Sequence, residues 1–307
     1  MMATFRVGTR GSPLALAQTE EVLTRLRAAH PDLRFETVPI KTHGDEGYRE
    51  DLGTSLDGKR AFTKRIEEAL LGNRIDFAVH SLKDLPTEMV SGLTIAAIPP
   101  RADPRDVLVV IDGLLSQQMP ADARVGTSSL RRRAQLLALW PKIRVTELHG
   151  NVGTRLRRLD AKEFDAVVVA AAGLARLQLQ DRIAEPFSPD VMTPAPGQGA
   201  LAVEARSKDL EVHQVLSAVD DADARRTTQA ERELAARVGG DCNVPFGALA
   251  SLDRDRLTLR AVVASPDGRR IVRAHAEDSA SGWRRVVDAA WKEIQAGGGQ
   301  EILEELK

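Results

Sequence analysis

The 307-residue chain is poor in the residues that characterise several large classes of protein. Its one cysteine, Cys242, cannot form an intrachain disulfide or a cysteine-rich metal site, and its six histidines show no ligand spacing. Aromatic residues make up only 4% of the chain, which leaves too few stacking platforms for a nucleic-acid surface. We therefore expect neither a bound metal nor a nucleic-acid partner.

Charge of one sign is not in excess either, because the chain has 43 Lys and Arg residues and 44 Asp and Glu residues, which give a net charge of -1. An anionic ligand would therefore need a local cluster of basic residues. No stretch approaches the roughly 20 apolar residues of a membrane helix, and the apolar run Leu14 to Ala17 is too short for the core of a signal segment. The expectation is a cytoplasmic protein that does not enter a membrane.

What the chain does have is an alternation of short apolar runs with segments of helical period, the pattern of α/β domains. Strands are predicted at 5–7, 35–40, 77–79 and 93–98, with helices over 13–29 and 63–71. Ser12 and Pro13 form a strong helix start, because the serine hydroxyl can accept a free N–H and proline fixes φ at the first helical position. A second unit of the same kind follows, with strands at 107–111, 143–147 and 166–170 and helices over 129–139 and 152–159.

Two proline-rich stretches, residues 99–104 and 194–199, predict crossings between these units, because proline resists both helix and central strand. From about Arg225 the pattern changes to a helix ending at 238, apolar runs at 248–252, 257–263 and 271–274, and a last helix over 283–296. This order predicts a small domain of antiparallel strands with helices on one face. The predicted domains are residues 1–99 with 200–218, residues 104–194, and residues 222–307.

Three turns rich in Gly, Ser, Thr or Asn lead into predicted helices and carry arginine. They lie at residues 10–12, at 126–129 before Arg131, Arg132 and Arg133, and at 150–154 before Arg155. Such turns offer free backbone N–H groups and hydroxyls to an anion, and arginine adds bidentate recognition of a carboxylate or phosphate. For any single arginine a solvated helix face explains the pattern equally well, but the repetition favours a ligand with several negative groups.

The segment 78–87 places Ser81, Lys83 and Asp84 at the end of a predicted strand, where open α/β sheets bind ligands. Asp84 beside Lys83 is read either as a surface ion pair or as a carboxylate buried over a site, where it would stabilise a developing cation. The residues alone favour the ion pair. His80 is interpreted as a packing histidine rather than a ligand.

Cys242 lies in the turn-rich stretch 239–247. A lone cysteine is most often a small buried hydrophobe, whereas in an exposed turn it is placed to act as a nucleophile. Both interpretations stay open on the residues alone.

Six ordered segments together resemble the signatures of the porphobilinogen deaminase family, also called hydroxymethylbilane synthase. The match runs over nearly the whole chain, at residues 10–16, 78–86, 126–132, 150–156 and 196–200 and at the turn that holds Cys242. The resemblance implies an α/β fold of two periplasmic-binding-protein-like domains with a cleft between them, plus a smaller α+β C-terminal domain that carries the cofactor. It also implies a monomeric cytoplasmic enzyme of haem and tetrapyrrole biosynthesis.

The family's reaction joins four porphobilinogen molecules head to tail, releases ammonia each time, and then hydrolyses the linear tetrapyrrole from the enzyme. The resemblance implies a dipyrromethane cofactor held by a thioether to Cys242, Asp84 as the catalytic residue, and Lys59 in a lid. The positions that match the family's carboxylate-binding residues, which would hold the growing oligopyrrole, are Arg10, Ser12, Lys83, Thr127, Ser129, Arg131, Arg132, Arg155 and Arg176. Further candidates are Ser81, Ser128, His149 and Gln198, with His149 standing where the family commonly has arginine.

Two other functions compete with this interpretation. A non-catalytic anion-binding protein of the periplasmic type would share the two α/β lobes, but it would need export and has no use for a third domain that presents a thiol. A pyridoxal phosphate enzyme that uses Lys83 would show visible absorbance from a Schiff base. The set of motifs does not support the second of these.

Overall fold

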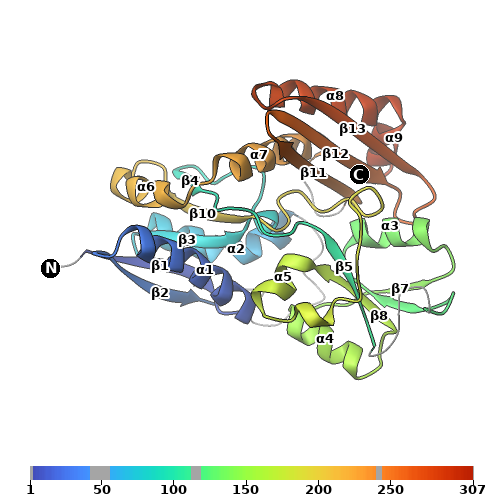
Figure 1. The fold of residues 1–307 in the computed structure, drawn as a ribbon, viewed down its shortest axis with the longest axis horizontal. Coiled ribbons are helices and arrows are strands. Elements are labelled where there is room, and N and C mark those ends of the chain that lie inside the picture. The colour runs from blue at the N-terminus through green and yellow to red at the C-terminus, as the bar shows by residue number, and fades with distance from the viewer. Residues whose placement is uncertain (1–2, 42–55, 112–118, 240–243, 307) are drawn as a thin grey trace. The chain divides into compact units, whose positions relative to one another are not determined.

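The computed structural model describes residues 3–41, 56–111, 119–239 and 244–306, with the backbone alone for 56–62 (Figure 1). The chain forms two compact units: Met1–Ala102 with Ala200–Arg226, and Asp103–Gly199 with Thr227–Lys307. The chain passes from the first unit to the second at 102–103 and returns at 199–200, and both positions lie within or next to the two proline-rich stretches. None of the described helices is both long and apolar enough to cross a membrane.

The first unit is built on one five-stranded sheet of order β2-β1-β3-β10-β4. Its strands are β1 (Thr4–Arg10), β2 (Arg34–Ile40), β3 (Phe77–Ser81), β4 (Leu93–Ala97) and β10 (Leu201–Arg206), and its helices are α1 (Pro13–Ala29), α2 (Leu56–Leu71) and α6 (Leu210–Leu216). Strand β1 runs parallel to β2 and β3, whereas β10 runs antiparallel to β3 and β4. The return of the chain at β10 therefore completes a sheet that the first 102 residues begin.

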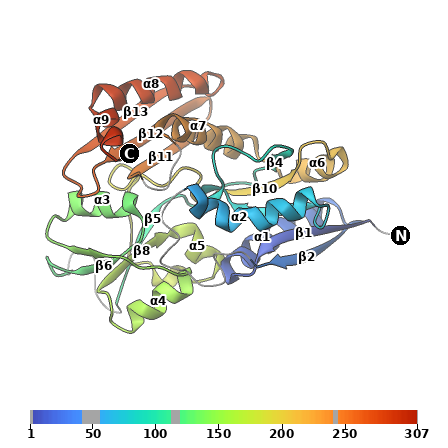
Figure 2. The same cartoon turned by 180° about the vertical axis from the view of Figure 1, so that it is seen from behind.

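Helices α1 and α2 cover opposite faces of this sheet, α1 in front in Figure 1 and α2 in front in Figure 2. On one face, Leu23 of α1 packs in a cluster with Phe77 and Val79 of β3. On the other face, Ile66 of α2 packs in a cluster with Ala78. Because side chains alternate along a strand, residues of β3 with even numbers point toward α2.

The second unit contains a five-stranded sheet of order β7-β6-β8-β5-β9 and a three-stranded sheet of order β11-β12-β13. The strands are β5 (Asp106–Val110), β6 (Arg124–Gly126), β7 (Arg144–Thr146), β8 (Ala166–Ala170), β9 (Glu185–Pro186), β11 (Phe246–Asp253), β12 (Arg256–Ala264) and β13 (Ile271–Ser279). The helices are α3 (Leu130–Leu139), α4 (Val152–Asp160), α5 (Ala171–Arg176), α8 (Trp283–Ala296), α9 (Gly299–Glu304) and the greater part of α7 (Ala222–Val238), whose residues up to Arg226 belong to the first unit. Strand β6 is parallel to β7 and β8, and β5 is antiparallel to β8.

The C-terminal sheet is antiparallel throughout and shares one apolar core with α7, α8 and α9. Leu234 of α7, Leu259 of β12 and Ile294 of α8 are fully buried in that core. The predicted α/β class and the small C-terminal region of antiparallel strands with helices are confirmed, and the bounds of the three domains stay a prediction.

The bounds of α1, β8 and α8 are as predicted, whereas α2 begins at Leu56, before the predicted start at residue 63. The prediction missed β6 and the short helices α5, α6 and α9. A strand of three residues or a helix of six or seven holds fewer than two full hydrophobic periods, which is too little repetition to identify these elements from the sequence.

Candidate active site

In the first unit, the carboxyl ends of β1 and β3 lie at the same edge of the sheet, because these neighbouring strands are parallel. A pocket at this edge is lined by Arg10, Ser12, Gln18, His80, Ser81 and Asp84, among others. The structure therefore brings the predicted residues Arg10, Ser12, Ser81 and Asp84 together from two motifs about 70 positions apart in the sequence. Lys83 lies next to them, partly buried, in the 3-10 turn Leu82–Asp84.

The start of α1 forms one wall of this pocket. The Ser12 hydroxyl accepts a hydrogen bond from the Ala15 N–H at 3.3 Å and caps the helix, as predicted. One turn later Gln18 donates from Nε2 to Oγ of Ser81 at 2.7 Å, which ties α1 to the end of β3. Sequence reasoning missed Gln18, since a glutamine in mid-helix gives no signal until its neighbour in space is known.

Asp84 is exposed and makes no hydrogen bond or ion pair with any residue that the structure describes. This position contradicts both interpretations drawn from the residues alone, the ion pair with Lys83 and the buried carboxylate. The physical reason is the 3-10 turn after β3, which buries Leu82 and leaves Asp84 on the outer side. The carboxylate is therefore available to a ligand.

In the second unit, the turn between β6 and α3 presents the predicted hydroxyls. The Thr127 hydroxyl accepts from the Ser129 N–H at 3.2 Å, and the Ser129 hydroxyl caps α3 by accepting from the Arg132 N–H at 3.4 Å. These bonds fix the turn at the start of a helix, where the positive end of the helix dipole favours an anion.

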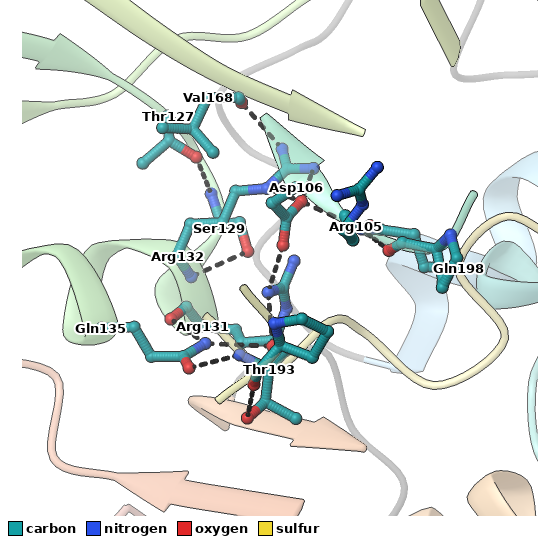
Figure 3. Close-up of polar contacts among 12 residues, drawn as sticks. Arg105, Asp106, Thr127, Ser129, Arg131, Arg132, Gln135, Val168, Thr193 and Gln198 are labelled. Atoms are coloured by element: carbon teal, nitrogen blue, oxygen red, sulfur yellow. Dashed lines mark hydrogen bonds and ion pairs between the residues drawn. The ribbon is translucent and has the colours of Figure 1, made fainter. Parts of the chain in front are cut away.

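Arg131 and Arg132 turn inward from α3 to one carboxylate, Asp106, at the start of β5 (Figure 3). Arg131 donates from Nη1 to Asp106 Oδ2 at 2.7 Å, and Arg132 donates to Oδ1 from Nε at 2.9 Å and from Nη2 at 2.7 Å. Gln198 donates from Nε2 to the same Oδ1 at 3.0 Å. We call these four residues the Asp106 cluster.

The Asp106 cluster is almost completely buried, with Asp106 0% exposed and each arginine 5% exposed. Burial alone would raise the pKa of Asp106, but the charges of Arg131 and Arg132 outweigh it and hold that pKa well below its usual value. Burial lowers the pKa of Arg131, and the Asp106 charge opposes this effect. Two guanidinium groups face one carboxylate, so the cluster keeps an excess of one positive charge.

Sequence reasoning missed Asp106, although it selected Arg131, Arg132 and Gln198. The available signal was a carboxylate at the first position of a strand, 106–110, whose other residues are all apolar and buried. A charged residue in that position must find partners inside the protein.

The second glycine-containing turn leads into α4, which Asn151 caps by accepting from the Thr154 N–H at 2.9 Å. Arg155 donates from Nε to the carbonyl of Gly150 at 3.0 Å and reaches Ser128 Oγ at 3.5 Å, so the two turns are linked. His149 Nε2 lies 3.1 Å from a carboxylate oxygen of Glu147. Arg176, at the end of α5, donates to the carbonyl of Gly199 at 3.2 Å.

Two predicted residues cannot be placed in the same way. Cys242 lies outside the described residues, and of Lys59 the structure describes the backbone alone. The helix that precedes Cys242 is nevertheless well anchored, because the buried Glu231 of α7 accepts from the N–H groups of Gly197 at 2.6 Å and Ala250 at 2.8 Å.

The donors of the second unit fit a ligand with several carboxylates, such as a dipyrromethane with its acetate and propionate groups. Buried excess positive charge is costly unless an anion compensates it, and helix-starting turns with hydroxyls add further donors. The groups in the described ranges do not suit a metal, since no three His, Cys, Asp or Glu side chains lie close enough together to hold one.

Comparisons with known proteins agree with this chemistry. Residues 5–214 match the family model described as porphobilinogen deaminase, dipyromethane cofactor binding domain, and residues 226–290 match the model of the porphobilinogen deaminase C-terminal domain. A porphobilinogen deaminase of Roseiflexus sp. (strain RS-1) is 47% identical over 99% of both chains. One of Acidithiobacillus ferrooxidans (strain ATCC 53993 / BNL-5-31) is 45% identical over 100% of this chain and 99% of its own. The chain therefore belongs to the porphobilinogen deaminase family of transferases, which act on porphobilinogen in tetrapyrrole and haem biosynthesis with a dipyrromethane cofactor.

Proposed function

We propose that this protein joins four porphobilinogen molecules head to tail, with loss of ammonia at each step, and then releases the linear tetrapyrrole hydroxymethylbilane by hydrolysis. The cofactor is attached through a thioether to Cys242. We further propose a cytoplasmic monomer with the domain bounds given above, in which the C-terminal domain carries the cofactor.

One observation carries the proposal: Asp84 is a carboxylate without a partner among the described residues, in the same pocket as Arg10 and Ser12. Porphobilinogen carries carboxylates that need cations and N–H donors, and it also carries a pyrrole ring that becomes positively charged as ammonia leaves. A pocket lined by a guanidinium, a hydroxyl and an available carboxylate suits both needs.

The remaining predicted residues bind the carboxylates of the oligopyrrole. Arg131 and Arg132 are fixed before any ligand arrives, and their excess charge favours a carboxylate near the Asp106 cluster. Thr127, Ser129 and Arg155 add donors from the helix-starting turns. Dipyrromethane supplies the primer to which the first porphobilinogen unit is joined.

Asp84 acts on the substrate itself. Its carboxylate accepts hydrogen bonds from pyrrole N–H groups and stabilises the positive charge that develops when the bond to ammonia breaks. It needs no fixed protein partner for this role, because its partner is the ring that reacts.

Intact mass measurement of the purified protein tests the proposal. The native chain is expected to carry the added mass of one dipyrromethane, to lose that adduct in Cys242→Ala, and to form hydroxymethylbilane from porphobilinogen. Cys242→Ser is the matched control for the thiol, because it keeps the size of the side chain. An unmodified native chain that binds anions without forming a bilane would replace the proposal with the anion-binding protein, and a visible chromophore lost in Lys83→Ala would replace it with the pyridoxal phosphate enzyme.

A further inference from the structure

A buried acid–base pair lies beside Asp84 and has no part in the function described so far. His80 of β3 places Nε2 3.1 Å from a carboxylate oxygen of Glu204 on β10, and the two side chains are 5% and 0% exposed. The N–O distance is that of an ion pair, but the atoms are not aligned for a hydrogen bond. Neither oxygen of Glu204 receives a hydrogen bond from any other described residue.

Glu204 therefore depends on His80 electrostatically. A buried carboxylate without a compensating charge or hydrogen bonds is strongly unfavourable, so it requires an N–H or a positive charge at the imidazole. The expectation of a packing histidine with satisfied hydrogen bonds is wrong for His80, which faces one charged residue at close range.

The sheet explains how the pair reaches the pocket. Strand β10 is antiparallel to β3, with Ala202 opposite His80 and Glu204 opposite Ala78, so His80 and Glu204 are diagonal neighbours on the α2 face. His80 also lines the pocket of Arg10, Ser81 and Asp84. With Nε2 against Glu204, Nδ1 is the ring nitrogen left to serve the pocket.

We propose that His80, oriented by Glu204, is a second catalytic residue, which accepts the proton that the attacking pyrrole carbon loses after the new bond has formed. This inference rests on the proposed function. In each condensation the C–N bond of porphobilinogen breaks, a C–C bond forms, and the C–H bond at the attacking carbon breaks. The aminomethyl group of porphobilinogen enters as an ammonium group and leaves as ammonia. The proton that the attacking carbon loses passes to Nδ1 of His80 and then to that ammonia, so ammonium is released and atoms and charge balance.

The other charged groups that line the pocket are less suited to accept this proton. Arg10, from β1, lines the same pocket, and a guanidinium is protonated near neutral pH and so cannot accept a proton. Asp84 is exposed, and its negative charge is needed on the cationic ring; a proton on Asp84 would cancel that charge. A histidine next to a buried carboxylate avoids the conflict, because the carboxylate stabilises the imidazolium that forms.

Porphobilinogen deuterated at its free pyrrole carbon tests the step. In His80→Gln holoenzyme, turnover is expected to fall roughly 10²-fold, and proton removal becomes slow enough that the deuterated substrate reacts more slowly than the ordinary one. Glu204→Gln is expected to change the rate and the isotope effect in the same direction. The matched control is His213→Gln, since His213 Nε2 lies 3.0 Å from the carbonyl of Arg206 on the same strand β10, and it should keep the native rate and isotope effect.

A second measurement does not depend on activity. In holoenzyme labelled with ¹⁵N-histidine, the His80 signals, assigned by their loss in His80→Gln, are expected to show a neutral ring protonated at Nε2 at neutral pH. Glu204→Gln should remove this preference. A His80 ring that is doubly protonated at neutral pH would overturn the proposal, because it could not accept a proton.

The kinetic outcomes distinguish a failure of the proposed role of His80 from a failure of the proposed function. If native holoenzyme converts porphobilinogen but His80→Gln keeps the native rate, or loses rate without a larger isotope effect, the role of His80 is structural and only this inference fails. If native protein forms no bilane at all, the proposed function fails first.

Discussion

Two aspartates, Asp84 in the first unit and Asp106 in the second, have opposite environments. Asp84 is exposed and makes no hydrogen bond or ion pair with a described residue, whereas Asp106 is fully buried and accepts hydrogen bonds from two arginines and a glutamine. The difference separates two tasks. A carboxylate that acts on a ligand must be available to it, while cations that bind a ligand work best when they are already fixed in place.

Of the substitutions that test this difference between the two aspartates, Asp106→Asn is expected to have the largest effect on stability. It leaves two buried guanidinium groups without their counter-charge, so the free energy of unfolding is expected to fall by about 3–5 kcal/mol. Urea denaturation of both proteins at neutral pH measures the loss. Arg131→Met is the control, and it should cost less because one arginine and one aspartate remain paired; an equal or larger loss there would contradict the charge count.

Asp84→Asn should instead reduce turnover strongly and leave the stability of the protein nearly unchanged. Turnover is expected to fall roughly 10²- to 10³-fold, because the carboxylate no longer stabilises positive charge on the substrate. Stability should stay within about 0.5 kcal/mol of the native protein, since the side chain is exposed. Steady-state formation of the bilane measures turnover, and urea denaturation measures stability. Near-native turnover would show that Asp84 takes no part in the chemistry.

Acid should reduce the stability that the Asp106 cluster gives to the folded protein. Because the folded protein lowers the pKa of Asp106, the unfolded chain takes up its proton at a higher pH than the folded chain does. The stabilisation is therefore complete above the unfolded pKa of about 3.9 and is lost as the pH falls below it toward the lower folded pKa. The stability difference between native protein and Asp106→Asn, measured from about pH 7 to about pH 3, should narrow only at the acid end.

The two capping serines should show the smallest effect and should behave alike. Ser12→Ala and Ser129→Ala each remove one acceptor from a helix start, so each is expected to cost about 1 kcal/mol of stability. Replacement by glycine should cost only a few tenths of a kcal/mol, which provides the control. If the hydroxyls also bind substrate carboxylates, both alanine variants should raise KM for porphobilinogen, and an unchanged KM would limit them to capping.

Much of the fold was predictable because its signals are local. The start of α1 follows from Ser12 and Pro13, and the bounds of β8 and α8 follow from hydrophobic periodicity. The turns before α3 and α4 were recognisable because a serine or asparagine directly before a helix can accept one of the N–H groups that the first helical turn leaves without a partner. Short elements such as β6 and α5 stayed hidden, since their stability comes from neighbours in the sheet.

The site was predictable only in part. Motifs indicated Arg131, Arg132 and Gln198 as ligand-binding residues, but nothing in their spacing showed that they meet at Asp106. The exposure of Asp84 was also not predictable, because it depends on how one 3-10 turn leaves the sheet.

The sequence by itself determined the α/β class, the helix-starting turns and the set of polar residues in the motifs, because capping, periodicity and turn chemistry act over a few residues. Only the tertiary structure decided which of those residues share a carboxylate, which stay exposed, and that His80 meets Glu204 across two strands 124 residues apart. The physical reason is that burial and ion pairing depend on distances between segments that the chain brings together only when β10 returns to the first sheet.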